Sequence, residues 1–98
     1  MIPFSFHPEA ATEFEAAAVF YESRVAGLGK SFAAEVERTV TLVREFPNAG
    51  SAVGKLFRRV LVARFPYALV YQVTGEEVHV IAVSHLHRYP GYWRYRTE

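Results

Sequence analysis

Two helical repeats of apolar residues follow one another almost without interruption in the first half of this 98-residue chain. Apolar side chains recur at three- and four-residue steps from Ala10 to Val25, and again from Leu28 to Phe46. This spacing places them along one face of an α-helix. Because so few residues, Gly27 among them, separate the two repeats, the helices must fold back on one another as an antiparallel hairpin.

The remaining apolar residues follow the period of two that is typical of β-strands. This pattern predicts strands over residues 3–7, 56–63, 66–73 and 78–84. Residues 47–54 are small and turn-forming, and they are predicted to form a mobile loop. We therefore expect a single α+β domain over residues 1–98, in the order β-α-α-β-β-β, with the helical hairpin packed on a small antiparallel sheet.

Several classes of function are excluded by what the chain lacks. It has no cysteine, so disulfides, zinc ribbons and thiol nucleophiles are ruled out, and it has no Asp for a Ser-His-Asp triad. His85 and His87 could supply half of a metal site, but the spacing signals no third ligand, so no metal or cofactor is predicted. The longest apolar run, residues 16–21, is far shorter than a membrane span of about 20 residues. With no secretion signal, a cytoplasmic protein without a membrane partner is expected.

The charges are divided unequally along the chain. Residues 1–46 carry a formal charge of −3 and residues 47–98 carry +4, although the total is only +1. Four of the bases, Lys55, Arg58, Arg59 and Arg64, lie on and around one predicted strand. Alternation places Arg58 and Arg64 on one face of that strand and Arg59 on the other. This group is either a charged edge strand that prevents unwanted pairing or a surface that contacts phosphates.

The last 14 residues combine aromatic and basic side chains. Residues 85–98 hold the only Trp, three Tyr, three Arg and two His. Guanidinium groups and aromatic faces together suit phosphates, stacked bases or a protein partner. Alternatively, Tyr92 and Trp93 fold back to close the core while the arginines are solvated. Both interpretations can hold, because a tail can pack with one side and bind with the other.

Four segments resemble the RelE/ParE superfamily of bacterial toxins, once described as plasmid stabilization proteins. They are residues 6–10 (Phe-His-Pro-Glu-Ala), 27–32 (Gly-Leu-Gly-Lys-Ser-Phe), 64–71 (Arg-Phe-Pro-Tyr-Ala-Leu-Val-Tyr) and 83–93 (Val-Ser-His-Leu-His-Arg-Tyr-Pro-Gly-Tyr-Trp). The resemblance runs nearly from end to end. It implies the same β-α-α-β-β-β order and the toxin role in a type II toxin–antitoxin module, with a cognate antitoxin, ParD-like or similar, as partner.

The branches of the superfamily differ in their target. The ending of this chain, from His85 to Trp93, looks more like the ParE branch. That resemblance implies a protein that has no active site of its own, binds DNA gyrase and stabilises its cleaved-DNA state. The RelE branch implies an endoribonuclease that cuts mRNA in the ribosome, and Arg59, Arg88 and Tyr92 are the catalytic candidates in that case. Ala68 and Leu86 stand where that branch is expected to carry arginines. A non-toxic member that only binds antitoxin is a third possibility.

The resemblance and the residues together yield two predicted binding sites. The residues predicted to bind the target are Arg58, Arg64, His85, His87, Arg88, Tyr92 and Trp93. Val19 and Phe20 lie off the apolar stripe of the first helix and would suit an apolar dock for the antitoxin. The alternative for this pair is that both side chains face the second helix.

Overall fold

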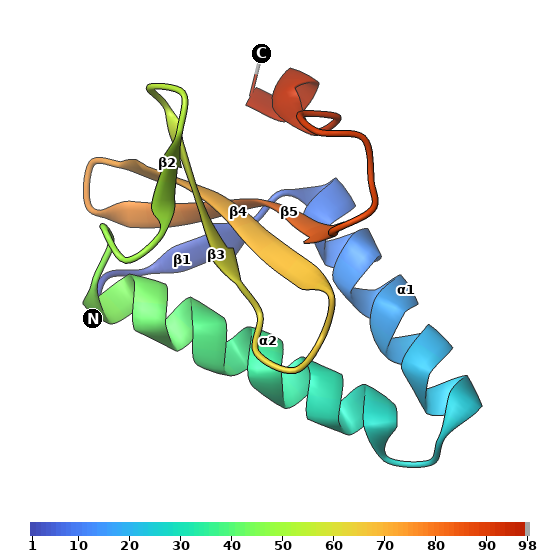
Figure 1. Ribbon diagram of the computed structural model, residues 1–98. Helices are drawn as coiled ribbons and strands as arrows, with labels where there is room; N and C mark the ends of the chain where they lie inside the picture. Colours follow the sequence, from blue (N-terminus) through green and yellow to red (C-terminus); the bar gives the residue numbers. More distant parts are fainter. Residues whose placement is uncertain (98) are drawn as a thin grey trace.

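The structure, a computed structural model, describes residues 1–97 as a helical layer, a sheet and a C-terminal tail (Figure 1). The elements in chain order are β1 (Phe4–Phe6), α1 (Pro8–Arg24), α2 (Leu28–Glu45), β2 (Ser51–Val53), β3 (Phe57–Leu61), β4 (Tyr67–Thr74), β5 (Glu77–His85) and the 3₁₀ helix η1 (Arg94–Thr97). The predicted α+β class and the helical hairpin are confirmed. No helix within this range has the length and hydropathy needed to cross a membrane.

The turn between the helices is held by a carboxylate from α1. Glu22 accepts hydrogen bonds from the backbone N–H groups of Gly27 (2.7 Å) and Gly29 (2.9 Å), which would otherwise be unpaired at the start of α2. These bonds, that of Gly27 first, lower the pKa of the Glu22 carboxyl. A Cβ at position 29 would lie 2.4 Å from the carbonyl oxygen of Ala18, so only glycine permits this approach of the two helices.

The five strands form one sheet in the order β1-β5-β4-β3-β2. Strand β1 runs parallel to β5, and the other neighbours are antiparallel. The prediction of a wholly antiparallel sheet is therefore wrong for β1. Strand β1 leads directly into α1 and pairs with the free edge of β5 (Figure 1). In that position it runs in the same direction as β5.

The segment predicted to be a mobile loop contains strand β2, so that prediction is wrong for residues 51–53. The preceding turn is held from the core. The hydroxyl of the buried Tyr71 donates to the Pro47 carbonyl (2.7 Å) and accepts from the Gly50 N–H (3.0 Å). Arg58 donates to the Gly50 carbonyl at 2.7 Å. These bonds align residues 51–53 with β3 although their side chains show no strand periodicity.

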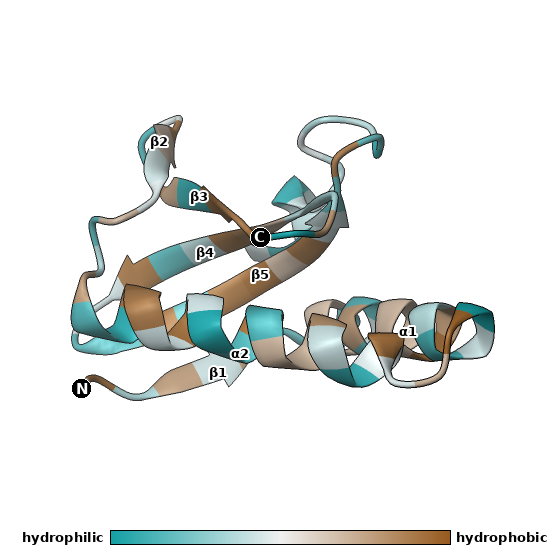
Figure 2. Ribbon diagram, turned by 60° about the horizontal axis from the view of Figure 1, so that its bottom comes forward, coloured by the Kyte–Doolittle hydropathy of each residue, from teal (hydrophilic) through white to brown (hydrophobic). Residues whose placement is uncertain are grey.

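The sheet lies between the helices on one face and the tail on the other (Figure 2). The larger core joins both helices to the sheet through residues such as Phe32, Val36, Leu69 and Tyr71, all essentially buried. A bulge in β5 leaves Ile81 unpaired, since Val70 faces Ala82 while Tyr71 faces Val80. As a result Ile81 and Ala82 both join a smaller core on the tail side.

Candidate binding face formed by the C-terminal tail

Trp93 anchors the tail to the sheet. Its side chain is 5% exposed and packs edge-to-face against Phe57, with ring centroids 4.7 Å apart. Val70, Ile81 and Ala82 complete this smaller core. Trp93 was predicted either to fold back or to contact a target, and its burial fixes it in the core.

A half-buried carboxylate on α1 holds the rest of the tail. Glu13 accepts two hydrogen bonds from the Arg96 guanidinium (2.9 and 3.0 Å) and one from the Tyr92 hydroxyl (2.5 Å). It also accepts the backbone N–H of Val83 at 3.1 Å, while Arg96 donates to the carbonyl of Ile81 at 2.9 Å. The pairing of β1 with β5 ends at Val80, so these side chains replace a strand along the remaining edge of β5.

Sequence reasoning missed this network. The only signal was an acid on the apolar stripe of α1, because Glu13 lies three residues after Ala10 and four before Ala17, both buried. The Arg96 side chain is 4% exposed, so its charge depends on Glu13 for compensation. Burial by itself would lower the pKa of Arg96, but the bonds to Glu13 and Tyr95 raise it.

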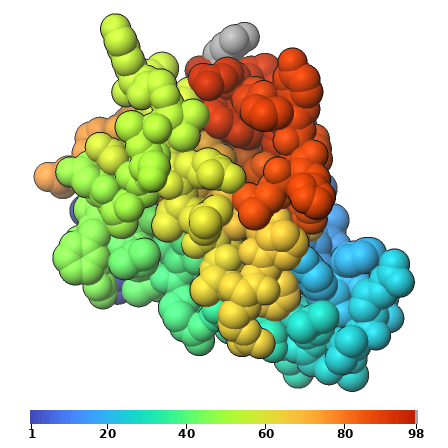
Figure 3. Space-filling model, viewed as in Figure 1, coloured from blue at the N-terminus to red at the C-terminus, as the bar shows by residue number. Residues whose placement is uncertain are grey.

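A basic concavity, here called the tail hollow, lies between β3, the end of β5 and the tail. Arg59, His85, Arg88, Tyr89 and Arg94 line it together with apolar residues, and its volume is about 380 Å³. No acidic side chain is among the described lining residues. The tail lies beside the β2–β3 segment in the space-filling view (Figure 3).

Three of the predicted target-binding residues, His85, Arg88 and Trp93, line the tail hollow, and His87 lies between the first two in the chain. The His85 ring accepts the backbone N–H of His87 at 3.0 Å, and the two imidazole centroids are 5.1 Å apart. The Arg88 guanidinium lies 3.9 Å from the centroid of the Tyr92 ring. Arg59, predicted only as a catalytic candidate, joins them from β3.

The other two predicted arginines lie elsewhere. Arg58 is bound to the Gly50 carbonyl, and Arg64 lies in the turn between β3 and β4 with a φ of 72°. The expectation that these two share a strand face is wrong, because β3 ends at Leu61. The interpretation of a charged edge strand is also wrong, because β2 covers that edge of β3.

The Tyr92 hydroxyl is fully engaged in the fold. Burial, reinforced by the hydrogen bond to Glu13, raises the pKa of Tyr92 to about 12. A general acid or base works best with a pKa near the working pH, so this phenol is poorly suited to proton transfer in neutral solution.

This raised pKa predicts a loss of stability in alkaline solution. In the unfolded chain a tyrosine ionises near pH 10, whereas folded Tyr92 keeps its proton to about pH 12. Its contribution to stability is therefore complete below pH 10 and declines as the pH rises toward 12. We expect urea midpoints, followed by far-UV circular dichroism, to fall over this window and to fall less in Tyr92→Phe. Part of the decline should remain, because burial also raises the pKa of Tyr21 and Tyr67. An equal decline in both proteins would contradict the assignment.

Val19 and Phe20 are exposed on α1, at 70% and 50%. The interpretation that they face α2 is wrong. Phe20 lines a shallow groove between α1 and β5 that His85 and Arg88 also border. The predicted antitoxin dock on α1 therefore adjoins the start of the C-terminal tail, where His85 and Arg88 lie.

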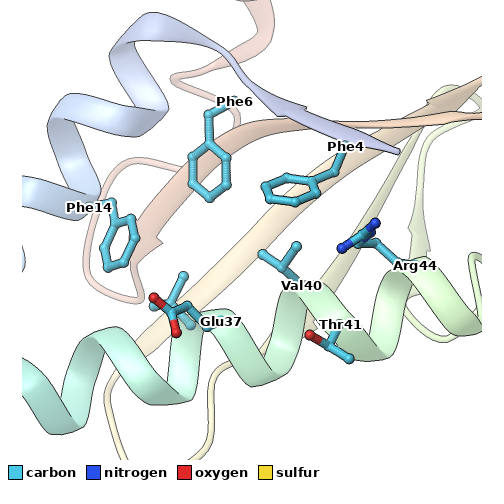
Figure 4. Close-up of a pocket in the computed structure, with 8 residues that line it drawn as sticks. Phe4, Phe6, Phe14, Glu37, Val40, Thr41 and Arg44 are labelled. Atoms are coloured by element: carbon cyan, nitrogen blue, oxygen red, sulfur yellow. The ribbon is translucent and has the colours of Figure 1, made fainter. Parts of the chain in front are cut away.

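A second, more apolar groove lies between β1 and α2 (Figure 4). Phe4 and Phe6 from β1 and Phe14 from α1 point toward α2, which contributes Glu37, Val40 and Thr41. Arg44 closes one end, donating to the Ile2 carbonyl at 2.7 Å with its guanidinium 4.9 Å from the Phe4 ring centroid. The period of two in residues 3–7 predicted that Phe4 and Phe6 share one face of a strand. Phe4 is nevertheless 43% exposed, because the groove is open.

The helical hairpin, the mixed sheet and the tail that closes its far face define a toxin domain of the RelE/ParE type. A family model described as "ParE toxin of type II toxin-antitoxin system, parDE" matches residues 4–96, so the chain belongs to this family. A solved structure of the chromosomal ParDE toxin–antitoxin system from P. aeruginosa has a similar fold, with a TM-score of 0.68 and 21% identity. The match covers 87% of this chain and 96% of that chain. A search of curated proteins found no match. Membership of the family implies an antitoxin partner.

Proposed function

We propose that this chain acts in the cytoplasm as a toxin that binds DNA gyrase and stabilises its cleaved-DNA state. A cognate antitoxin, ParD-like or similar, inactivates it. The observation that carries the proposal is the hydrogen bond from the Tyr92 hydroxyl to Glu13. It commits the one predicted catalytic tyrosine to the fold, which favours a binding surface over the ribosome-dependent cleavage of mRNA.

The exposed rim of the tail hollow is the proposed target surface. Arg88 is exposed at this rim and His87 is exposed next to it in the chain, whereas Trp93 is buried and Arg58 is bound to the backbone. The proposed antitoxin surface is the exposed part of α1 around Val19 and Phe20, whose apolar side chains suit the apolar face of a partner segment.

The test is a cleavage reaction with purified gyrase and supercoiled plasmid, treated with detergent and protease. Added toxin should produce linear DNA, and antitoxin should suppress it. We expect His87→Ala and Arg88→Ala to reduce linear DNA roughly tenfold, the effect of losing about 1.4 kcal/mol of binding energy. Lys30→Ala, an exposed change on α2, is the matched control.

The antitoxin surface is tested in the same reaction. Val19→Asp and Phe20→Asp should still produce linear DNA but should resist suppression by antitoxin, whereas Leu42→Asp on α2 should remain suppressible. Absence of linear DNA from the folded wild-type protein would overturn the gyrase proposal. Cleavage of mRNA in translating ribosomes would then support the ribonuclease alternative.

A further inference from the structure

The outer edge of β2 is free within residues 1–97, because β2 is the last strand of the sheet and pairs only with β3. The backbone register identifies the groups that face this edge. On β3 the ladder continues past Leu61, which lies opposite Ala68, to Val62, whose N–H donates to the Tyr67 carbonyl (2.9 Å). Hydrogen-bonded pairs alternate along an antiparallel ladder, so the backbone groups of Arg59, three residues earlier, face β2 rather than β4.

Ala52 therefore presents its backbone to the outside of the sheet. Arg59 and Phe57 form the hydrogen bonds of β3 to their partners in β2, which are Ser51 and Val53. The residue between these partners has the opposite orientation, so the N–H and C=O of Ala52 point away from β3 toward the free edge. Ala52 is exposed, and both of its backbone groups can pair with an added strand.

An added strand would place alternate side chains at the mouth of the tail hollow. Val53 lines the hollow, and Ser51 lies on the same face of β2 because side chains alternate along a strand. A residue paired with Ala52 would point to the opposite face, while the residues before and after it would lie across from Ser51 and Val53. Two side chains of the added segment, separated by one residue, would therefore face the hollow.

The charges of the tail hollow favour acidic side chains at those two positions. Arg59 and Arg94 line it, and within residues 1–97 neither forms an ion pair with a carboxylate. An added strand would lie about 10 Å from β3, twice the spacing of neighbouring strands, and Arg59 and a glutamate can span that distance together. A second copy of this chain is a poor fit, because pairing of two β2 edges would bring the Lys55 and Arg59 side chains of one copy toward those of the other.

We propose that the outer edge of β2 binds an extended segment of gyrase by strand addition, with acidic residues at two alternate positions facing the tail hollow. This inference rests on the proposed function, because Arg88 of the proposed target surface lines the same hollow. Backbone hydrogen bonds at Ala52 supply affinity for an extended chain, and the cations supply preference for the acidic pattern.

The experiment measures fluorescence anisotropy of a labelled Glu-Val-Glu-Val-Glu peptide with the full chain, in the absence of gyrase. Ala52→Pro should weaken binding roughly two- to tenfold, because it removes the outward N–H at an edge position where proline is tolerated. Ala52→Thr keeps that N–H and should bind more tightly than Ala52→Pro. Arg59→Gln should weaken binding roughly two- to fivefold, the effect of one exposed ion pair. Lys30→Gln, an exposed change on α2, is the charge control.

Two altered peptides test the same contacts without changing the protein. N-methylation of both valines removes the donor that the Ala52 carbonyl accepts, and it should weaken binding roughly two- to tenfold. The rearranged peptide Glu-Glu-Glu-Val-Val keeps the charge but loses the alternation, and it should bind more weakly than the original. Circular dichroism verifies that each protein variant is folded.

In the gyrase reaction, Ala52→Pro should produce less linear DNA than the wild type, and the original peptide should compete with gyrase. The inference alone is overturned if the wild type produces linear DNA but the peptide does not bind, the N-methylated peptide binds equally well, or Ala52→Pro loses no activity. A single-stranded oligonucleotide that binds where the peptide does not would assign the hollow to nucleic acid, and a dimer that Ala52→Pro dissociates would assign the edge to a second copy; each overturns it. Absence of linear DNA from the folded wild type overturns the proposed function and, with it, gyrase as the source of the segment.

Discussion

Glu13→Ala is expected to lower the free energy of unfolding by about 3–5 kcal/mol, which is a large part of the stability of a domain this size. The change removes the acceptor of four hydrogen bonds. It leaves the Arg96 charge almost fully buried with no equivalent partner, and the N–H of Val83 unpaired at the edge of β5. We expect the tail to separate from the sheet at lower urea concentrations than those that melt the helices.

Trp93 makes this prediction easy to measure because it is the only tryptophan in the chain. Its fluorescence reports the docking of the tail, while far-UV circular dichroism reports the helices. Glu15→Ala, two residues further along α1 and exposed, should change stability by no more than about 0.5 kcal/mol. In the double variant Glu13→Ala with Arg96→Ala the loss should be smaller than the sum of the single losses. A loss below about 1 kcal/mol in Glu13→Ala would contradict the role assigned to this carboxylate.

Trp93→Ala is expected to cost about 3–5 kcal/mol through a cavity on the tail side of the sheet. The indole packs against Phe57 and closes a core that also holds Val70, Ile81 and Ala82. Unfolding in urea, followed by circular dichroism, measures the loss. Tyr89→Ala removes an aromatic ring from the same tail at 80% exposure, and its stability should stay within about 0.5 kcal/mol of the wild type. Equal stability of the two variants would show that the tail is not part of the core.

These two predictions change how target binding should be studied. A truncation after His87 would remove Trp93, Tyr92 and Arg96 together and would expose the far face of the sheet. Loss of activity would then reflect loss of the fold. Substitutions of the exposed His87 and Arg88 separate binding from folding.

Periodicity predicted the elements whose side chains face one core. The stripes of α1 and α2 were largely predicted correctly, because burial on one face imposes the period directly. In β4 the predicted face of Tyr67, Leu69 and Tyr71 does meet the larger core, but the opposite face is buried too, through Val70. Strand β2 was missed because its pairing depends on Tyr71 and Arg58, which lie 18 and 5 residues beyond Val53 in the sequence. The parallel direction of β1 likewise depends on which edge of β5 is free.

The candidate binding face could be predicted only in part from the sequence. The cluster of Arg, His and aromatic residues in the last 14 residues predicted a special surface, and the hollow lies there. Composition could not distinguish Arg96, which is buried, from Arg94, which is exposed. That difference is made by Glu13, whose importance comes from contacts with residues about 80 positions away.

The distance along the chain between Glu13 and its partners also sets an order of events during synthesis. Tyr92 follows Glu13 by 79 residues, so at roughly 5–20 residues per second it is made about 4–16 seconds later. Trp93 and Arg96 are made later still, and until then neither can pack against the sheet. The helical hairpin, complete by Glu45, precedes them. A nascent chain therefore presents Val19 and Phe20 before its tail face exists, and a partner that binds α1 has this interval in which to arrive first.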